Sequence, residues 1–127
     1  MTDMNIINRR LEISDELIEN VLAEAFMGGI VYWADNISCE DIKDMKKVGG
    51  WKHEYLTKTK KKDAVMYIHD GETGEKYPMT KKSIIDALQK LDTEHSETLD
   101  RILSEQYDAD DADIVVQIAC FGEIVFG

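Results

Sequence analysis

The chain has 127 residues with 26 acidic and 15 basic side chains, so its formal net charge is −11. This length fits one domain, and an apolar fraction of 43% with a single proline argues against intrinsic disorder. No apolar run reaches the roughly 20 residues that span a bilayer, and the first ten residues lack the pattern of a signal peptide. We therefore expect a soluble, cytoplasmic protein with reduced cysteines and no membrane contact.

The first part of the chain predicts a strand followed by a long helix. Residues 5–13 alternate imperfectly between apolar and polar side chains, which favours a short strand. Ser14 is a typical helix cap, and the apolar spacing after it predicts a helix over residues 15–35. Gly28 and Gly29 could stop this helix earlier, but the apolar phase continues through both glycines.

The middle of the chain indicates an antiparallel sheet of three to four strands. The strands are predicted over residues 37–42, 51–57, 64–69 and 76–79. Gly49 and Gly50 are a hairpin signal, and residues 70–74 are typical of a turn. Pro78 cannot donate a ladder hydrogen bond, so we expect the last strand at an edge of the sheet.

Helices are predicted to complete the chain. Thr80 caps one helix, His95 marks a break before a second, and the last central helix is predicted over residues 110–126. Small residues on one face of segments 20–33 and 114–127 predict that these two helices pack together on the sheet. The whole chain, 1–127, is thus expected to form a single α+β domain with its helices mainly on one face of the sheet.

The charge is distributed unevenly along the chain. Residues 40–62 hold 8 basic and 4 acidic side chains, whereas residues 86–127 hold 2 and 11. Because an acidic protein repels nucleic acid and attracts basic surfaces, we predict a protein partner with a basic surface and no direct binding of nucleic acid. The plainer interpretation is that these charges serve solubility and the start of the last helix. The predicted partner-binding residues are Asp100, Glu105, Asp108, Asp110, Asp111 and Asp113.

The basic middle of the chain supports an alternative function. Here lysines adjoin aromatic residues, a combination that can hold a phosphate-bearing base by charge and stacking. In this alternative an oligomer sequesters a nucleotide-type signal, although a solvated basic loop is the plainer interpretation. The predicted ligand-binding residues are Trp51, Tyr55, Lys58, Lys60, Lys61 and Lys62.

No sequence pattern points to catalysis. Histidines and cysteines lack metal-type spacing, the aspartates of residues 108–113 do not fit a calcium loop, and no glycine-rich phosphate loop occurs. We predict no catalytic residue, no metal and no cofactor, which leaves a small enzyme of unknown reaction as a further alternative. Trp33 and residues 124–126 offer apolar surface beyond the needs of a small core, which is compatible with a homodimer.

Two segments carry a resemblance to known proteins. The sequence AFMGGIVYWA at residues 25–34 and the closing FGEIVFG at residues 121–127 resemble segments of small uncharacterised phage and prophage proteins. The resemblance implies an accessory gene of a mobile element. Such proteins often neutralise host defence by binding a protein or by sequestering a signal. It therefore implies a non-enzymatic, anti-defence type inhibitor of a host factor in the bacterial cytoplasm.

Overall fold

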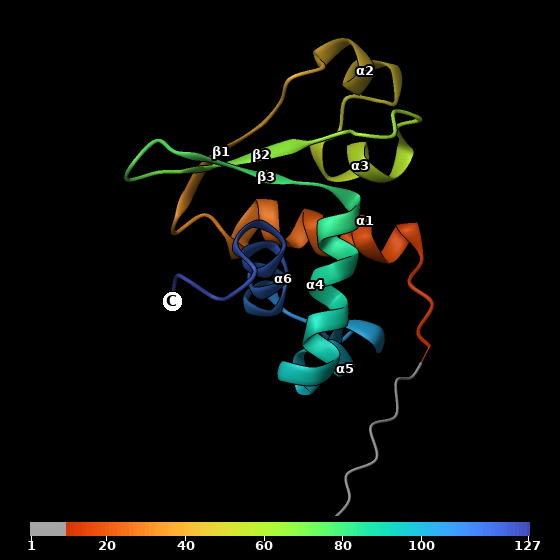
Figure 1. Cartoon of the computed structure of the whole chain (residues 1–127), viewed down its shortest axis with the longest axis vertical. Coiled ribbons are helices and arrows are strands. Elements are labelled where there is room, and N and C mark those ends of the chain that lie inside the picture. The colour runs from red at the N-terminus through yellow and green to blue at the C-terminus, as the bar shows by residue number, and fades with distance from the viewer. Residues whose placement is uncertain (1–9) are drawn as a thin grey trace, which may run out of the picture.

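The computed structural model describes residues 10–127, which form an α+β fold with one antiparallel three-stranded sheet (Figure 1). The strands β1 (Ala34–Cys39), β2 (Met66–Asp70) and β3 (Lys76–Met79) lie in the order β1-β2-β3. The predicted fold class is therefore confirmed, with three strands. Pro78 lies in β3, at an edge of the sheet as predicted.

Helices account for most of the remaining chain. They are α1 (Asp15–Glu24), the π-helical turn η1 (Ala25–Gly29), α2 (Ile42–Lys47), the 3-10 turn η2 (Lys52–Glu54), α3 (Tyr55–Lys58), α4 (Lys81–Glu94), α5 (Ser96–Leu103) and α6 (Ala109–Phe121). The helices α1, α4 and α6 lie beneath the sheet in Figure 1, while α2 lies beyond its other side. The predicted gathering of helices on one face is thus correct for the three long helices that build the core.

The core lies between the sheet and these helices. Along β2 the side chains alternate, so that Met66 and Ile68 are buried while Tyr67 and His69 are half-buried on the other face. This alternation follows from the pleat of a strand with one covered face. The same apolar cluster includes Leu22 from α1.

The helix starts agree with the predicted caps. The side chain of Ser14 accepts a hydrogen bond from the backbone N–H of Leu17, and Thr80 accepts one from Ser83. Asp108 caps α6 in the same way through the N–H of Asp111. These side chains satisfy N–H groups that have no partner within the first helical turn.

Two predicted helices are too long. The first ends at Gly29 rather than at residue 35, since a π-helical turn at Ala25–Gly29 leads into a non-helical turn and then into β1. The last ends at Phe121, because Gly122 adopts the left-handed conformation with φ of 78° and stops the helix. In both cases apolar residues continue at helical spacing beyond the end, but a non-helical backbone carries them.

Three predicted strands differ in the structure. Residues 5–9 of the first lie outside the described residues, and the remainder, 10–13, forms no strand. The segment 51–57 is helical, since it forms η2 and most of α3. Ile42 begins α2 rather than extending β1, and Gly49 and Gly50 follow α2 with positive φ instead of joining two strands. Short apolar alternation therefore did not distinguish a strand from a single helical turn here.

The predicted packing of the first and last helices against each other is confirmed, but the close approach lies at Ala109 and Asp113, before the predicted segment 114–127. The turn η1 lies directly against α6, and a Cβ atom at Gly29 would stand 2.4 Å from the carbonyl oxygen of Ala109. The missing side chain at Gly29 therefore allows the two backbones to approach. The pair forms one layer beneath the sheet, with α6 also in contact with β3.

Candidate functional site

The start of α6 is tied into the interior through Asp113. Its carboxylate accepts hydrogen bonds from the Tyr32 hydroxyl at 2.6 Å, from Trp33 Nε1 at 2.8 Å and from the Gln117 amide at 3.0 Å. Burial of the phenol and the bond to Asp113 raise the pKa of Tyr32 to about 12. Asp113 is only 6% exposed, so the expectation that it faces a partner is wrong.

Gln117, one helical turn further along α6, holds the end of the chain. Its side-chain oxygen accepts hydrogen bonds from the backbone N–H groups of Val125 and Phe126, both at 2.8 Å. Phe126 then stacks on Trp33, with ring centroids 4.8 Å apart and planes 9° from parallel. Trp33 is consequently 5% exposed, which corrects the expectation that it offers spare surface for a homodimer.

Asp111 is the second aspartate that turns inward. Arg101 from α5 donates to both of its carboxylate oxygens, with Nη2 at 2.8 Å from Oδ1 and Nε at 2.9 Å from Oδ2. The residue is 3% exposed, so it too was wrongly assigned to a partner surface. Asp111 therefore links α6 to α5 through Arg101. It also completes the cap of α6, because its Oδ2 accepts a hydrogen bond from the backbone N–H of Asp108.

The pair of Arg101 and Asp111 predicts a pH-dependent stability. Hydrogen bonding to Arg101 holds the pKa of Asp111 below its ordinary value of 3.8. A lowered pKa stabilises the folded state above the ordinary value, and this stabilisation is lost as the pH falls through the lowered pKa. We therefore expect Arg101→Gln to lower the melting temperature more at pH 7 than at pH 2. Thermal unfolding of both proteins across this range measures the difference, and an equal loss at all pH values would contradict it.

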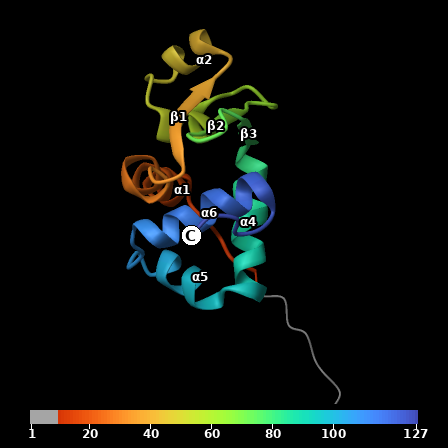
Figure 2. The same cartoon turned by 90° about the vertical axis from the view of Figure 1, so that its left-hand side faces the viewer.

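The other four predicted acidic residues are exposed. Asp100 lies on α5, Glu105 and Asp108 lie in the linker that follows, and Asp110 lies in the first turn of α6. In Figure 2 this linker and the start of α6 lie on one side of the molecule, beneath α1. The structure thus brings part of the predicted surface together and turns two of its six members inward.

Further carboxylates join this surface from the other end of the chain. Glu12 and Glu16, at the start of α1, line a hollow of about 390 Å³ together with Glu105. Burial raises the pKa of Tyr107, and the nearby carboxylates of Glu24, at the end of α1, and Glu105 raise it further. We call Glu12, Glu16, Glu24, Asp100, Glu105, Asp108 and Asp110 the acidic face. Residues 1–39 contain two arginines and seven carboxylates, a net charge of −5. This excess was the signal in the sequence that the first helix contributes to the acidic face.

An apolar corner adjoins the acidic face. Three large apolar side chains that lie close together in the chain are exposed here. They are Met27, Val31 and Tyr32, which are 85%, 59% and 56% exposed. They are placed beside α6 because Gly28 and Gly29 pack against Ala109 at its start. The carboxylate of Asp110 lies near enough to Tyr32 to contribute to its raised pKa. The apolar corner therefore meets the acidic face at Asp110.

The basic segment is built differently from the predicted ligand site. Tyr55 is 1% exposed, and its hydroxyl donates to Asp44 at 2.8 Å, so its ring cannot stack on a ligand. Trp51 is exposed but does not line the hollow beside the lysines. Lys58 pairs with Glu54 one turn earlier. Of the six predicted residues, only Lys60, Lys61 and Lys62 line one hollow, which measures about 510 Å³.

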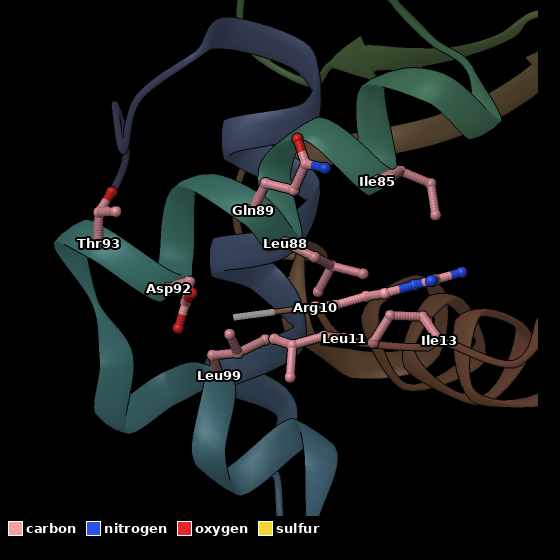
Figure 3. A pocket seen from close by; sticks show the side chains of 9 residues that line it. All are labelled: Arg10, Leu11, Ile13, Ile85, Leu88, Gln89, Asp92, Thr93 and Leu99. Carbon is pink, nitrogen blue, oxygen red and sulfur yellow. The ribbon is translucent and has the colours of Figure 1, made fainter. Parts of the chain in front are cut away.

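An apolar hollow of about 440 Å³ lies between the chain before α1 and the helices α4 and α5 (Figure 3). Leu11, Leu88 and Leu99 point toward one another in its middle. The side chains of Gln89 and Thr93 point away from this middle. Arg10 and Asp92 also line the hollow, from the chain before α1 and from α4, but nothing in the structure identifies a ligand for them, so we assign this hollow none.

One pair of side chains has the distance of a nucleophile and its base. Ser38 Oγ and His69 Nε2 lie 2.7 Å apart across β1 and β2. Among residues 10–127, no carboxylate is hydrogen-bonded to His69 to orient its ring, as a catalytic triad requires. No group of three metal-ligating side chains occurs in this part of the chain either. We interpret the pair as a cross-strand hydrogen bond on the open face of the sheet.

The comparisons with known proteins give no family. No family model, no curated protein and no solved structure matches the chain. Within the described residues, no helix has both the length and the apolar character needed to cross a membrane.

Proposed function

We propose that the protein is a non-enzymatic accessory protein of a phage or prophage that binds and inhibits a host factor in the bacterial cytoplasm. The partner presents a basic surface, and the inhibition is of the anti-defence type. The mobile-element origin rests on the resemblance of residues 25–34 and 121–127 to small phage proteins. The mode of binding rests on the surface that the acidic face and the apolar corner form together.

The single observation that carries this proposal is the exposed apolar corner beside the carboxylates. Met27, Val31 and Tyr32 leave large apolar areas in water, which is typical of the centre of a protein interface. Methionine is unbranched and adapts its shape to a partner. Asp110 borders this centre, where charged groups steer association and select a basic partner.

The acidic face makes a testable contribution to binding. A triple variant, Glu105→Gln, Asp108→Asn and Asp110→Asn, removes three exposed negative charges. It preserves the cap of α6, because asparagine caps helices as well as aspartate does. We expect about tenfold weaker affinity for the partner at low salt and a shallower dependence on salt concentration, because rim charges act mainly through long-range attraction. Affinity purification from host cells followed by titration of the recovered partner measures both.

A matched variant separates this surface from net charge alone. Glu40→Gln, Asp63→Asn and Glu75→Gln also remove three exposed carboxylates, but these lie on the sheet and its loops. This control is expected to bind the partner with nearly unchanged affinity. Met27→Ser with Val31→Ser is expected to weaken binding at every salt concentration, since it removes apolar contact area. Equal affinity of the acidic-face triple variant and the unaltered protein would reject this surface.

A further inference from the structure

The hollow beside Lys60, Lys61 and Lys62 is completed by residues that lie about twenty positions later in the chain. Lys81 and Lys82, the first two residues of α4, contribute to the same lining. Asp63 is the one carboxylate among its lining residues. We call this site, with its five lysines, the lysine hollow. It lies in a protein of net charge −11, so five lysines around one hollow are unexpected from composition alone.

The lysines of the hollow are either unpaired or weakly paired. Lys61 contacts Asp41 at 3.2 Å, Lys81 contacts Asp15 at 2.9 Å and Lys82 contacts Asp86 at 2.8 Å. All three pairs are exposed to solvent, and such pairs contribute little to stability, so an anion can replace the carboxylates at low cost. Among the described residues, no carboxylate lies within ion-pair distance of Lys60 or Lys62.

The start of α4 adds backbone donors to these charges. Thr80 accepts from the N–H of Ser83, but the N–H groups of Lys81 and Lys82 have no acceptor within the helix. The helix has 14 residues, so its dipole adds positive potential at this end. Helix starts of this kind bind phosphate groups, and here lysines from two separate segments lie around the start of α4.

We propose that the lysine hollow binds a small ligand with two or more phosphate groups, held through those groups. Five ammonium groups on two segments match several charges better than one. Among residues 10–127 no aromatic side chain lines the hollow, so a base would find no stacking partner there. An extended nucleic acid would also meet the repulsion of a protein of net charge −11, whereas a compact ligand stays within the hollow. This site is separate from the acidic face and does not depend on its partner.

Binding of inorganic tripolyphosphate tests the proposal directly. Isothermal titration at constant ionic strength is expected to show one site on the unaltered protein, with sulfate binding at least tenfold more weakly. The double variant Lys60→Gln and Lys62→Gln is expected to lose at least tenfold in affinity for tripolyphosphate. Neither lysine has a carboxylate partner among the described residues, so the variant should keep the melting temperature of the unaltered protein.

A second pair of lysines provides the control. Lys46 and Lys47, on α2, are exposed and do not line the hollow, so Lys46→Gln with Lys47→Gln changes the charge equally. This variant is expected to bind tripolyphosphate as the unaltered protein does. Equal losses in the two variants would show attraction by net charge without a site. That result, an absence of binding at millimolar tripolyphosphate, or equal affinity for sulfate would each overturn the proposal.

Discussion

Replacement of Gly29 by alanine is expected to lower the free energy of unfolding by about 3 kcal/mol. The added Cβ would stand 2.4 Å from the carbonyl oxygen of Ala109 and 3.2 Å from the backbone nitrogen of Asp113. Both are backbone atoms of α6, which cannot turn aside as a flexible side chain would. The turn η1 and α6 must therefore separate, and the contacts between them weaken. Urea denaturation measures the change, which corresponds to a fall in melting temperature of roughly 10 °C.

The neighbouring glycine is a matched control. A Cβ at Gly28 would have Ala109 Cβ as its nearest contact, at 3.8 Å, an ordinary van der Waals distance. Alanine restricts the unfolded chain more than glycine does, so Gly28→Ala is expected to be neutral or to stabilise by about 0.5 kcal/mol. Similar effects of the two substitutions would contradict the close approach of η1 and α6.

Replacement of Asp113 by alanine is expected to destabilise the fold by about 4 kcal/mol, the cost of breaking a buried charged network. The substitution removes the acceptor of Trp33 Nε1, of the Tyr32 hydroxyl and of the Gln117 amide. The indole N–H would remain buried without a partner, which is the larger part of the penalty, whereas the Gln117 amide keeps the Phe126 carbonyl as an acceptor. The free energy of unfolding from urea denaturation, compared with that of the unaltered protein, measures the effect.

Two further variants separate this effect from a general loss of acidic charge. Asp110→Ala removes an exposed aspartate from the same helix start, and it is expected to cost only about 0.5 kcal/mol through the helix dipole. Asp113→Asn keeps one carbonyl oxygen as an acceptor and should give an intermediate loss. If Asp113→Ala were no more harmful than Asp110→Ala, the assignment of Asp113 as a buried anchor would be wrong.

Local signals in the sequence predicted the elements whose causes are themselves local. The caps Ser14 and Thr80 begin helices as expected, because capping depends on residues within one turn. The turn before β3 likewise forms where Asp70 accepts from the backbone N–H groups of Glu72 and Thr73. Pro78 correctly predicted that β3 lies at an edge of the sheet, where a missing donor is tolerated.

The errors arose where distant residues decide the structure. Ile30 and Trp33 keep a helical spacing but are buried from a non-helical turn, since α6 and the tail cover them. Tyr55 and its neighbour Leu56 are both buried. Consecutive residues of a strand point to opposite faces, whereas a helix packed against α1 can bury both side chains.

The same reason explains the candidate site. Asp111 and Asp113 look like Asp108 and Asp110 in the sequence, and only the positions of Arg101, Tyr32 and Trp33 separate them. Tyr32 and Trp33, which hold Asp113 inside, lie some 80 residues away from it, beyond the reach of any local pattern. Likewise, Lys81 and Lys82 join Lys60–Lys62 only because α4 begins beside their loop.

The stacking of Phe126 on Trp33 gives the molecule a built-in optical reporter. Its two tryptophans occupy opposite environments, since Trp33 is 5% exposed and Trp51 is 63% exposed. In a Trp51→Phe background, the remaining fluorescence comes from the junction where η1, α6 and the C-terminal tail meet. Detachment of the tail would bring water to the indole and shift its emission to longer wavelength without any unfolding of the sheet. One fluorophore can thus distinguish release of the tail from loss of the whole fold.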